Sequence, residues 1–403
     1  MKPKPPLQPG PLNGIRVIDF SSVLMGPVST RTLGDLGADV IAIEPAIGDR
    51  NRAMGPGPTE EFSGTSLNLM RNKRSVALDL KAPGGTQVFL DIAATCDVMI
   101  TNQRPGPLSR LGLDYDNVRT VRPDVVFCQA HGFPSDSPLR DEPAYDDIIQ
   151  SACGLADLFE RMGEPPRLLP TLVADKVCGM AIANAVMAAL LHRAKTSEGQ
   201  HIEIAMIDVM RAFVLTEHGS GAISEAIDAP AGYPRILTPQ RRPHPTADGW
   251  INVLPYDEQH YVDLFAFVDR EDAFDRELAR TRRLRTMNSD QLYRSVASIL
   301  PERTTADWLT YCREKGIPAA PMASLDELVH DLPIAEHPTA GAYRVIPPAE
   351  RFSATPQSVR RPAPRIGEHG REVLSEIGYH ARAIDDLVGD QVLLRSQSTE
   401  PAE

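Results

Sequence analysis

The sequence predicts an α/β protein whose first domain is built on a doubly wound parallel sheet. Short apolar segments of strand length alternate with helical patterns from residue 15 onward. A long apolar helix follows near residue 177, and proline-rich connections interrupt the second half of the chain. Alternation of this kind produces parallel strands, because each helix carries the chain back to the same end of the sheet. A chain of 403 residues is long enough for two or three domains.

The first three elements form a βαβ unit. Residues 15–20 (IRVIDF) and 38–44 (ADVIAIE) have the apolar content of buried strands, and residues 28–36 predict a short helix that ends at Gly37. Glycine is typical of a helix end, because it adopts the left-handed conformation without steric cost. The alternation continues with strands at 75–80, 97–100 and 124–129 and helices at 85–96 and 115–121.

A long helix and one more strand complete this pattern. The helix is predicted from about Lys176 to Arg193, and the turn at 197–200 leads into a strand at 201–206. Its longest apolar stretch, Val177 to Leu191, contains Asn184 and is shorter than the roughly 18 residues that a membrane span requires. We therefore expect a buried core helix and no membrane partner.

The second half of the chain predicts a smaller domain. The stretch from about 222 to 246 is rich in Pro, Gly and Ala, which favours a crossover between domains. A strand is predicted at 250–254 and helices near 258–268, 290–300 and 305–315. From the pattern alone, residues 341–388 are either an independent tail or a return to the first domain.

Charge and cysteine content restrict the partners and the compartment. The 42 Lys and Arg against 54 Asp and Glu give a net charge of −12, which repels nucleic acids and anionic membrane surfaces. The five cysteines contain no C-x-x-C, and the ten histidines do not fall into ligand spacing, so we expect neither a disulfide framework nor a metal. The N-terminal Met-Lys-Pro-Lys-Pro-Pro is not followed by an apolar segment, so we expect a cytoplasmic protein.

The common nucleotide and hydrolase motifs are absent. The first strand-to-helix turn, residues 21–27, has no G-x-G-x-x-G, and Pro27 lacks the N–H that a pyrophosphate requires. The sequence also contains no P-loop, zincin or G-x-S-x-G motif. These absences argue against a nicotinamide-dependent dehydrogenase, a P-loop enzyme and an α/β-hydrolase.

A set of short segments along the chain is more specific than these absences. It comprises Gly37-Ala38-Asp39-Val40-Ile41, Asn72-Lys73-Arg74-Ser75-Val76, Arg104-Pro105-Gly106, Arg110-Leu111-Gly112-Leu113 and Gly367-Glu368-His369. In this order the set resembles the family III CoA-transferases (the CaiB/BaiF group, which includes formyl-CoA transferase). The same superfamily contains the α-methylacyl-CoA racemases. The resemblance runs from about Leu12 to Tyr379 and is weakest between 222 and 245.

The resemblance implies a fold and an assembly. The family has a large Rossmann-like domain built from both chain ends, a second, smaller α/β domain, and two chains interlocked in a homodimer. In that fold the C-terminal segment returns to the large domain. We therefore divide the chain into a large CoA-binding domain at 1–221, a linker and small domain at 222–338, and a return to the large domain at 339–403.

Asp175 matches the catalytic nucleophile of this family. The implied reaction moves CoA between an acyl-CoA thioester and a free carboxylic acid through an aspartyl anhydride and an aspartyl-CoA thioester, without ATP or metal. Electrostatics at a helix start agree, because the macrodipole lowers the pKa of a carboxyl group there and keeps the nucleophile ionised. From the local pattern alone, an N-cap is the commoner role for an aspartate at this place, and it stays open.

Tyr145 and Asp146 match positions near the bound CoA and beside the reaction centre. The racemases have a His-Asp pair here, and tyrosine, with a reference pKa near 10, is a poor base at neutral pH. This difference favours a transferase over a racemase-type isomerase. The isomerase and a non-catalytic CoA-binding protein remain the alternatives.

Five further residues match the nucleotide side of the CoA site: Asn102, Arg104, Arg110, Lys73 and Arg74. Cations there make physical sense, because an acidic protein must neutralise the CoA phosphates locally. A solvated surface charge is the simpler alternative for each basic residue, and it is favoured for Arg241 and Arg242 in the crossover.

Three departures from the family leave the acyl donor and acceptor open. Leu24 stands where some transferases have glutamine, and Ala42 replaces the usual lysine of the second strand. The glycine-rich loop that covers the intermediate in formyl-CoA transferase has no counterpart, the nearest glycines being Gly219 and Gly221.

Overall fold

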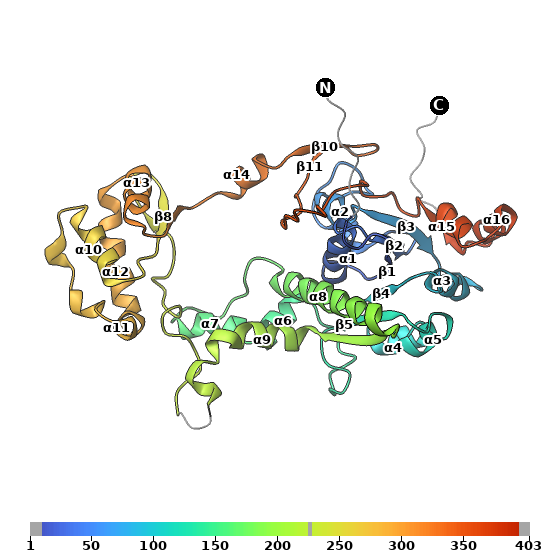
Figure 1. Ribbon diagram of the computed structural model, residues 1–403, viewed down its shortest axis with the longest axis horizontal. Coiled ribbons are helices and arrows are strands. Elements are labelled where there is room, and N and C mark those ends of the chain that lie inside the picture. Colours follow the sequence, from blue (N-terminus) through green and yellow to red (C-terminus); the bar gives the residue numbers. More distant parts are fainter. Residues whose placement is uncertain (1–9, 225–227, 395–403) are drawn as a thin grey trace. The chain divides into compact units, whose positions relative to one another are not determined.

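The computed structural model describes residues 10–224 and 228–394, which form two compact units. Figure 1 shows their helices and strands, coloured along the sequence from the N-terminus to the C-terminus. The first unit takes its described residues from Met1–Cys153, Pro170–Arg211 and Leu332–Glu403, and the second from Gly154–Leu169 and Ala212–Asp331. The second unit thus includes residues 154–169 and 212–221, which the sequence division assigned to the large domain. The helical pattern alone does not reveal on which unit such a segment packs.

A seven-stranded sheet forms the centre of the first unit, in the order β12-β3-β2-β1-β4-β5-β6. Neighbouring strands from β1 to β6 are parallel, and β12 pairs antiparallel with β3. The strands are β1 (Arg16–Phe20), β2 (Asp39–Glu44), β3 (Lys73–Leu78), β4 (Val98–Thr101), β5 (Val126–His131), β6 (Gln200–Ala205) and β12 (Leu393–Leu394). The order reverses between β1 and β4, and sheets of this kind bind ligands at such a point.

Helices connect the parallel strands and cover the sheet. They are α1 (Met25–Asp35), η1 (Arg50–Ala53), α2 (Gly64–Leu69), α3 (Gly85–Ala93), α4 (Pro105–Arg110), α5 (Tyr115–Val121), α6 (Asp146–Ala152) and α8 (Val173–Thr196). The C-terminal segment returns to this sheet through α15 (Gly370–Glu376), which contacts β3, through α16 (Ala381–Gly389), and through β12. A hairpin of β10 (Ile334–His337) and β11 (Gly341–Arg344) also belongs to this unit.

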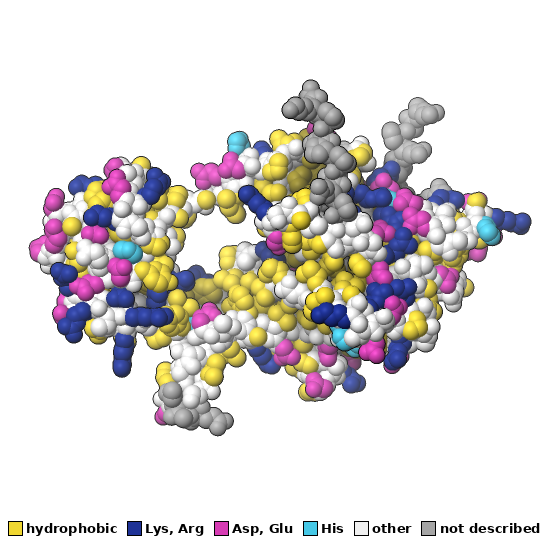
Figure 2. Space-filling view, in the orientation of Figure 1, with side chains coloured by type: hydrophobic (Ala, Val, Ile, Leu, Met, Phe, Trp, Pro, Cys, Tyr) yellow, Lys and Arg dark blue, Asp and Glu magenta, His cyan; other side chains and the backbone are white. Residues whose placement is uncertain are grey.

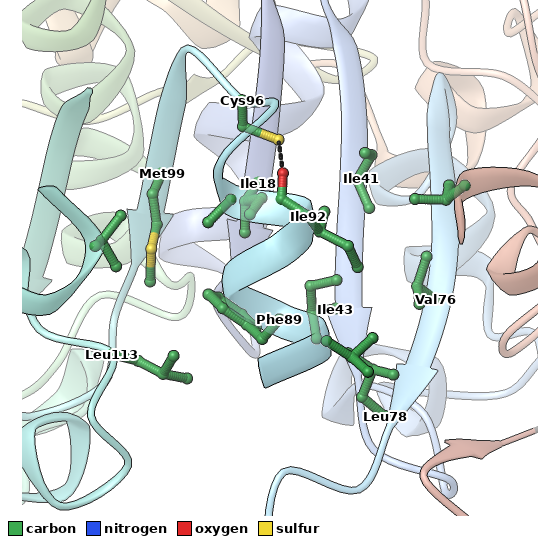
Figure 3. Close-up of a cluster of buried hydrophobic side chains, with 14 of the residues drawn as sticks. Ile18, Ile41, Ile43, Val76, Leu78, Phe89, Ile92, Cys96, Met99 and Leu113 are labelled. Atoms are coloured by element: carbon green, nitrogen blue, oxygen red, sulfur yellow. Dashed lines mark hydrogen bonds between the residues drawn. The ribbon is translucent and has the colours of Figure 1, made fainter. Parts of the chain in front are cut away.

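The main core lies between the sheet and α3. Ile18, Ile41 and Val76 extend from neighbouring strands towards Phe89 and Ile92 of α3, as Figure 3 shows, and all five side chains are fully buried. Apolar residues on three adjacent strands are typical of a parallel sheet that is covered on its faces. This packing holds the carboxyl ends of the strands in place.

The second unit has its own core. Strands β7 (His244–Pro245), β8 (Trp250–Val253) and β9 (Ala319–Pro321) form an antiparallel sheet. Its helices include α7 (Leu155–Arg161), α10 (Glu258–Ala266), α11 (Arg282–Met287), α12 (Ser289–Ile299), α13 (Thr305–Lys315) and α14 (Leu325–His330), and α9 (Met206–His218) joins it to the first unit. Trp308 is fully buried and donates from Nε1 to the Leu300 carbonyl at 2.8 Å.

Helix α8 is longer than the apolar stretch that predicted it. By length and composition alone its 24 residues suffice to cross a membrane, as do those of many core helices. Here α8 packs against α1, β5 and β6. The start of α8 lies near the carboxyl ends of the central strands, where the strand order reverses.

Candidate active site

A cavity of about 480 Å³ opens in the first unit at the carboxyl ends of β1, β4 and β5. The turn after β1, the loop after β2 and the residues after β4 form much of its wall. The remainder comes from the end of β5, from the segment before α6 and from the start of α8. Residues used below that line it are Ser22, Arg50, Asn102, His131, Tyr145 and Asp175. The cavity therefore lies at the point where the strand order reverses.

Asp175 lies in the cavity wall as the third residue of α8. The N-cap of this helix is Leu172, so the capping role left open by the sequence does not apply to Asp175. Its side chain is largely buried, with 9% of the residue surface exposed. In the described part of the chain, no residue donates a hydrogen bond to its carboxylate, which leaves both oxygens free for a ligand.

The carboxyl group of Asp175 has a pKa raised to about 7, chiefly because burial disfavours the charged form and also because Asp146 repels it. The expectation of a lowered pKa was therefore wrong. A helix dipole contributes about 0.3–1 kcal/mol, and up to ~2 in partly buried sites. The shift from 3.8 to about 7 corresponds to roughly 4 kcal/mol in the opposite direction. Near neutral pH, Asp175 therefore exchanges between its protonated and charged forms.

Asp146 is the first residue of α6 and is almost fully buried. Its Oδ1 accepts a hydrogen bond from the Asp175 backbone N–H at 3.1 Å, and its Oδ2 accepts one from Gln150 Nε2. Asp146 does not line the cavity, although it lies directly behind Asp175. The structure thus brings the two predicted catalytic residues together and gives Asp146 the place of a positioning residue.

Tyr145 lies at the mouth of the cavity with 55% of its surface exposed. Its hydroxyl oxygen accepts a hydrogen bond from Arg50 Nη1 at 2.9 Å. Arg50 also lines the cavity and is exposed. The sequence interpretation missed Arg50, although it directly follows the Gly48-Asp49 pair that contributed to the family resemblance.

The turn after β1 is held from two sides. Asn102 accepts from the Ser22 N–H at 3.0 Å and donates to the Ser22 carbonyl at 2.7 Å. Val23 has a φ of 73°, strained for a β-branched residue, and its N–H donates to Asp49 Oδ1 at 3.2 Å. Burial raises the pKa of Asp49 to about 6. Asn102 therefore lies in the cavity wall and shapes it through the turn after β1.

Arg104 and Arg110 begin and end the same short helix. Arg104 is the N-cap residue of α4, lines the cavity, and donates from Nη1 to the Asp141 carbonyl. Arg110 is the last residue of α4 and is exposed, and it does not line the cavity. The structure thus places one of these two predicted CoA contacts in the wall and the other outside it.

Lys73 and Arg74 do not have the surroundings predicted for CoA ligands. Lys73 is fully buried, with Nζ 2.9 Å from Asp19 Oδ2. The Arg74 side chain is 4% exposed and pairs with Asp39 at 2.6 Å and Glu376 at 2.8 Å. Both residues lie in β3 and neither lines the cavity. Their charges are already neutralised inside the protein, which corrects the prediction that they bind CoA phosphates.

His131 is the second functional candidate that the sequence interpretation missed. It ends β5, lines the cavity, and is buried, with Nε2 3.1 Å from Glu203 Oε1. A single histidine at the end of an apolar strand carries no motif. Its partner lies 72 positions further along the chain, so only the pairing of β5 with β6 reveals it.

Within the described ranges, no group of three or more His, Cys, Asp or Glu side chains has the arrangement to hold a metal ion. Leu24 is buried beside Val28 and Leu69 and does not line the cavity. The position where some transferases have glutamine thus contributes no polar contact to the wall.

Comparisons with known proteins agree on one family. The sequence model described as CoA-transferase family III matches residues 12–370. The succinyl-CoA:glutarate CoA-transferase of Mus musculus is 30% identical over 95% of this chain and 90% of its own. The succinate–glutarate CoA-transferase of Agrobacterium fabrum is 31% identical over 91% and 96%. A crystal structure of a CaiB/BaiF family protein from Brucella suis is 26% identical, with a TM-score of 0.78 over 92% of this chain and 100% of that one.

Proposed function

Because this chain belongs to CoA-transferase family III, we propose that it moves CoA from an acyl-CoA thioester to a free carboxylic acid with Asp175 as the nucleophile. One observation carries the assignment of Asp175. It is a largely buried carboxylate without hydrogen-bond partners among the described residues, at the N-terminal end of α8 and in the wall of the cavity. The lone pairs of such a carboxylate remain available to attack the carbonyl carbon of a ligand in the cavity.

The proposed reaction has two symmetrical halves. A carboxylate oxygen of Asp175 attacks the thioester carbonyl carbon, the C–S bond breaks, and an aspartyl anhydride and a CoA thiolate result. The thiolate attacks the aspartyl carbonyl carbon, which releases the donor acid and leaves an aspartyl-CoA thioester. The acceptor carboxylate then reverses these steps. No proton or electron is gained or lost overall, and the thioester energy is kept throughout.

Burial increases the reactivity of the Asp175 carboxylate. Desolvation raises the free energy of the charged carboxylate, and this raises its reactivity towards the carbonyl carbon. The hydrogen bond from the Asp175 N–H to Asp146 orients the start of α8 against α6. Asp146 therefore contributes through position and charge, and we propose that it does not contact the substrate.

We propose that the polar end of CoA binds at the mouth of the cavity. Arg50 and Arg104 are exposed cations of the wall, and Tyr145 offers an exposed ring and a hydroxyl oxygen. Guanidinium groups suit phosphates, because they donate two parallel hydrogen bonds. Arg110 is proposed as a contact on the resemblance alone, since it lies outside the wall.

We further propose that the exchanged acids are dicarboxylic acids. The mouse and Agrobacterium relatives are named for succinate and glutarate, which each carry a second carboxylate beyond the one that forms the thioester. The names of these relatives support the class of substrate and not the individual acid.

The surface of α8 supports the proposed homodimer. The helix packs against α1 on one side, and its exposed side carries large apolar residues, with Met180 and Leu191 55% and 58% exposed. Figure 2 shows hydrophobic side chains gathered over this helix. Large exposed apolar side chains of this kind favour burial against a second chain. We propose the interlocked dimer around a Rossmann-like large domain in the cytoplasm, and light scattering at twice the chain mass of 44.1 kDa tests the dimer.

The covalent adduct is the test of the mechanism. Incubation with succinyl-CoA followed by hydroxylamine or borohydride is expected to modify the Asp175 side chain, located by mass spectrometry of the peptide Thr171–Lys176. Asp175→Asn is the control and should remain unmodified. Transfer without any adduct at Asp175 would refute the mechanism. Deuterium uptake at the acyl α-carbon without transfer would instead indicate a racemase-type isomerase.

A further inference from the structure

The turn after β1 contains a strained residue. Val23 has a φ of 73°, and among the described residues it is the only β-branched side chain with a positive φ. This conformation is a steric outlier for such a side chain, because Cβ and its branches crowd the backbone. Strain of this kind persists only where the surroundings impose it, and it gathers at functional sites. Val23 lines the cavity, so the contact that imposes the strain also shapes the site.

Asp49 supplies this contact. Its Oδ1 accepts from the Val23 N–H at 3.2 Å and from the Asn51 N–H at 2.7 Å. Asp49 is 8% exposed, and burial raises its pKa to about 6, whereas the hydrogen bonds from Asn51 and Val23 oppose the rise. The two N–H groups therefore favour the charged carboxylate, which forms stronger hydrogen bonds than a neutral acceptor. One such bond is comparable in free energy with the strain of one backbone position.

A buried ion pair holds Asp49 in place. The Asp49 N–H donates to Glu44 Oε2 at 2.8 Å, and Arg52 donates to the two oxygens of Glu44 at 2.8 and 2.7 Å. Glu44 ends β2, and Arg52 lies in η1. The carboxylate of Asp49 thus reaches the turn after β1 from a fixed position on the loop after β2. It cannot follow Val23 freely if the turn relaxes.

The strained turn is connected to the start of α8. Helix α1 begins at Met25, two residues after Val23, and packs against α8. At Gly179, one helical turn after Asp175, a Cβ atom would lie 2.8 Å from the Met25 carbonyl oxygen, so the two helices are in close contact there. Val23, Met25 and Asp175 all line the cavity. A change of φ at Val23 would therefore move the wall that adjoins the carboxylate of Asp175.

We propose that Asp49 is a positioning residue, which holds Val23 in its strained conformation and so keeps the turn after β1 in the shape that the reaction at Asp175 requires. The inference rests on the proposed function for the reaction itself. Asp49 acts through the backbone of Val23 and contacts no reacting atom. Its loss should therefore reduce kcat more than the affinity for CoA, because a small misplacement of the wall disturbs the geometry of attack.

A simpler role for Asp49 is the N-cap of η1, through the same oxygen and the Asn51 N–H. Two substitutions separate these roles. Asp49→Asn retains an oxygen at the position of Oδ1 and can accept from both N–H groups. Asp49→Ser also caps a helix, but its hydroxyl lies one bond closer to the backbone. We expect the serine to retain the contact with Asn51 and to lose the contact with Val23.

The assay uses succinyl-CoA as donor and glutarate as acceptor. For each variant kcat and KM are measured, and calorimetry gives the Kd of free CoA. We expect Asp49→Ser to lower kcat about 10- to 100-fold with the Kd of CoA within about 3-fold, as for a misplaced wall with its phosphate contacts intact. Asp49→Asn should lower kcat less than about 5-fold, because it keeps the contact without the charge.

Val23→Gly is the background that decides between the two roles, because glycine adopts a φ of 73° without steric cost. In this background Asp49→Ser should lower kcat less than about 3-fold relative to Val23→Gly alone, since the turn no longer has to be held. A capping role alone would give the same loss in both backgrounds. Equal loss in both, or a loss in Asp49→Asn as large as in Asp49→Ser, would overturn the proposal.

Val23→Pro tests the same contact from the other side, because proline has no N–H and cannot adopt a positive φ. It should lower kcat with Asp49 in place and with the affinity for CoA retained. If Asp49→Ser does not fold, this variant decides the question, and a wild-type kcat in Val23→Pro would contradict the proposal.

Failure of the proposed function is a separate outcome. Crystal structures of Asp49→Ser and Asp49→Asn test the contact without turnover, since Val23 should have a negative φ in the first and a positive φ in the second. That result in a protein that transfers no CoA to any acid would refute transfer and support the role of Asp49. A φ near 73° in Asp49→Ser, together with unchanged kcat, would do the reverse.

Discussion

Replacing Asp175 by asparagine is expected to stabilise the folded protein at neutral and alkaline pH. Asparagine has nearly the same size, and it removes a charge that burial and Asp146 make unfavourable in the folded state. The gain should depend on pH in a way that no change in packing would imitate.

The magnitude follows from the pKa. In the folded protein the pKa of Asp175 is about 7, against 3.8 for the ordinary group. Well below the ordinary pKa of 3.8 the carboxyl group is protonated in both states, and at pH 4 the substitution still changes stability by less than about 1 kcal/mol. Between pH 4 and 7 the unfolded chain loses this proton first, and the wild type loses about 1.4 kcal/mol of stability per pH unit relative to the variant. Above pH 7 the difference levels off at roughly 4 kcal/mol, an upper bound.

Urea unfolding at pH 4, 5.5, 7 and 8.5 measures this difference at one fixed protein concentration, since assembly also affects stability. The expected result is a gap between variant and wild type that opens from pH 4 to pH 7 and then stays constant. Asp175→Glu is the matched control, because it retains the charge and should show no such gap. A pH-independent difference, or a variant that is less stable at pH 8.5, would refute the assignment of a raised pKa.

Three further predictions address the nucleophile, the mouth of the cavity and β3. The rate of transfer should rise with pH through about 7, because Asp175 must lose its proton to attack; a flat profile of kcat/KM from pH 5.5 to 8 would contradict this. Arg50→Ala should weaken CoA about 10- to 100-fold in calorimetry with the fold intact, as expected for a lost phosphate contact, and an unchanged Kd would remove Arg50 from the site. Lys73→Met should cost about 3–5 kcal/mol in urea unfolding, because Asp19 is left buried without its partner; a folded variant with normal stability but weakened CoA binding would restore Lys73 as a ligand.

The strands and their order along the chain could be predicted from short stretches of the sequence. The segments 15–20 and 38–44 are observed as Arg16–Phe20 and Asp39–Glu44, because apolar runs of strand length bounded by turn residues depend on near neighbours only. The family resemblance is confirmed for the same reason, since it rests on short segments in a fixed order.

The start of β3 shows where local reasoning failed. The predicted strand began at Ser75, whereas the observed strand includes Lys73 and Arg74. Two consecutive cations indicate an exposed segment in a sequence. Here they pair with Asp19 and Asp39 from other strands, and those partners let both charges be buried. The same pairs explain why these residues were wrongly assigned to CoA.

Asp175 shows most clearly what the sequence can predict and what depends on the tertiary structure. The sequence alone placed a carboxyl group at the start of a long helix, and the resemblance predicted that it is the nucleophile. Its burial, its repulsion by Asp146 and the resulting pKa of about 7 depend on the packing of α6 against α8 at the carboxyl ends of the strands. His131 is the same case, since its pairing with Glu203 arises only when β5 and β6 lie side by side. Periodicity and local motifs determine which elements form, whereas the protonation and reactivity of a side chain depend on solvent exclusion and on charges distant in sequence, which only the tertiary structure brings together.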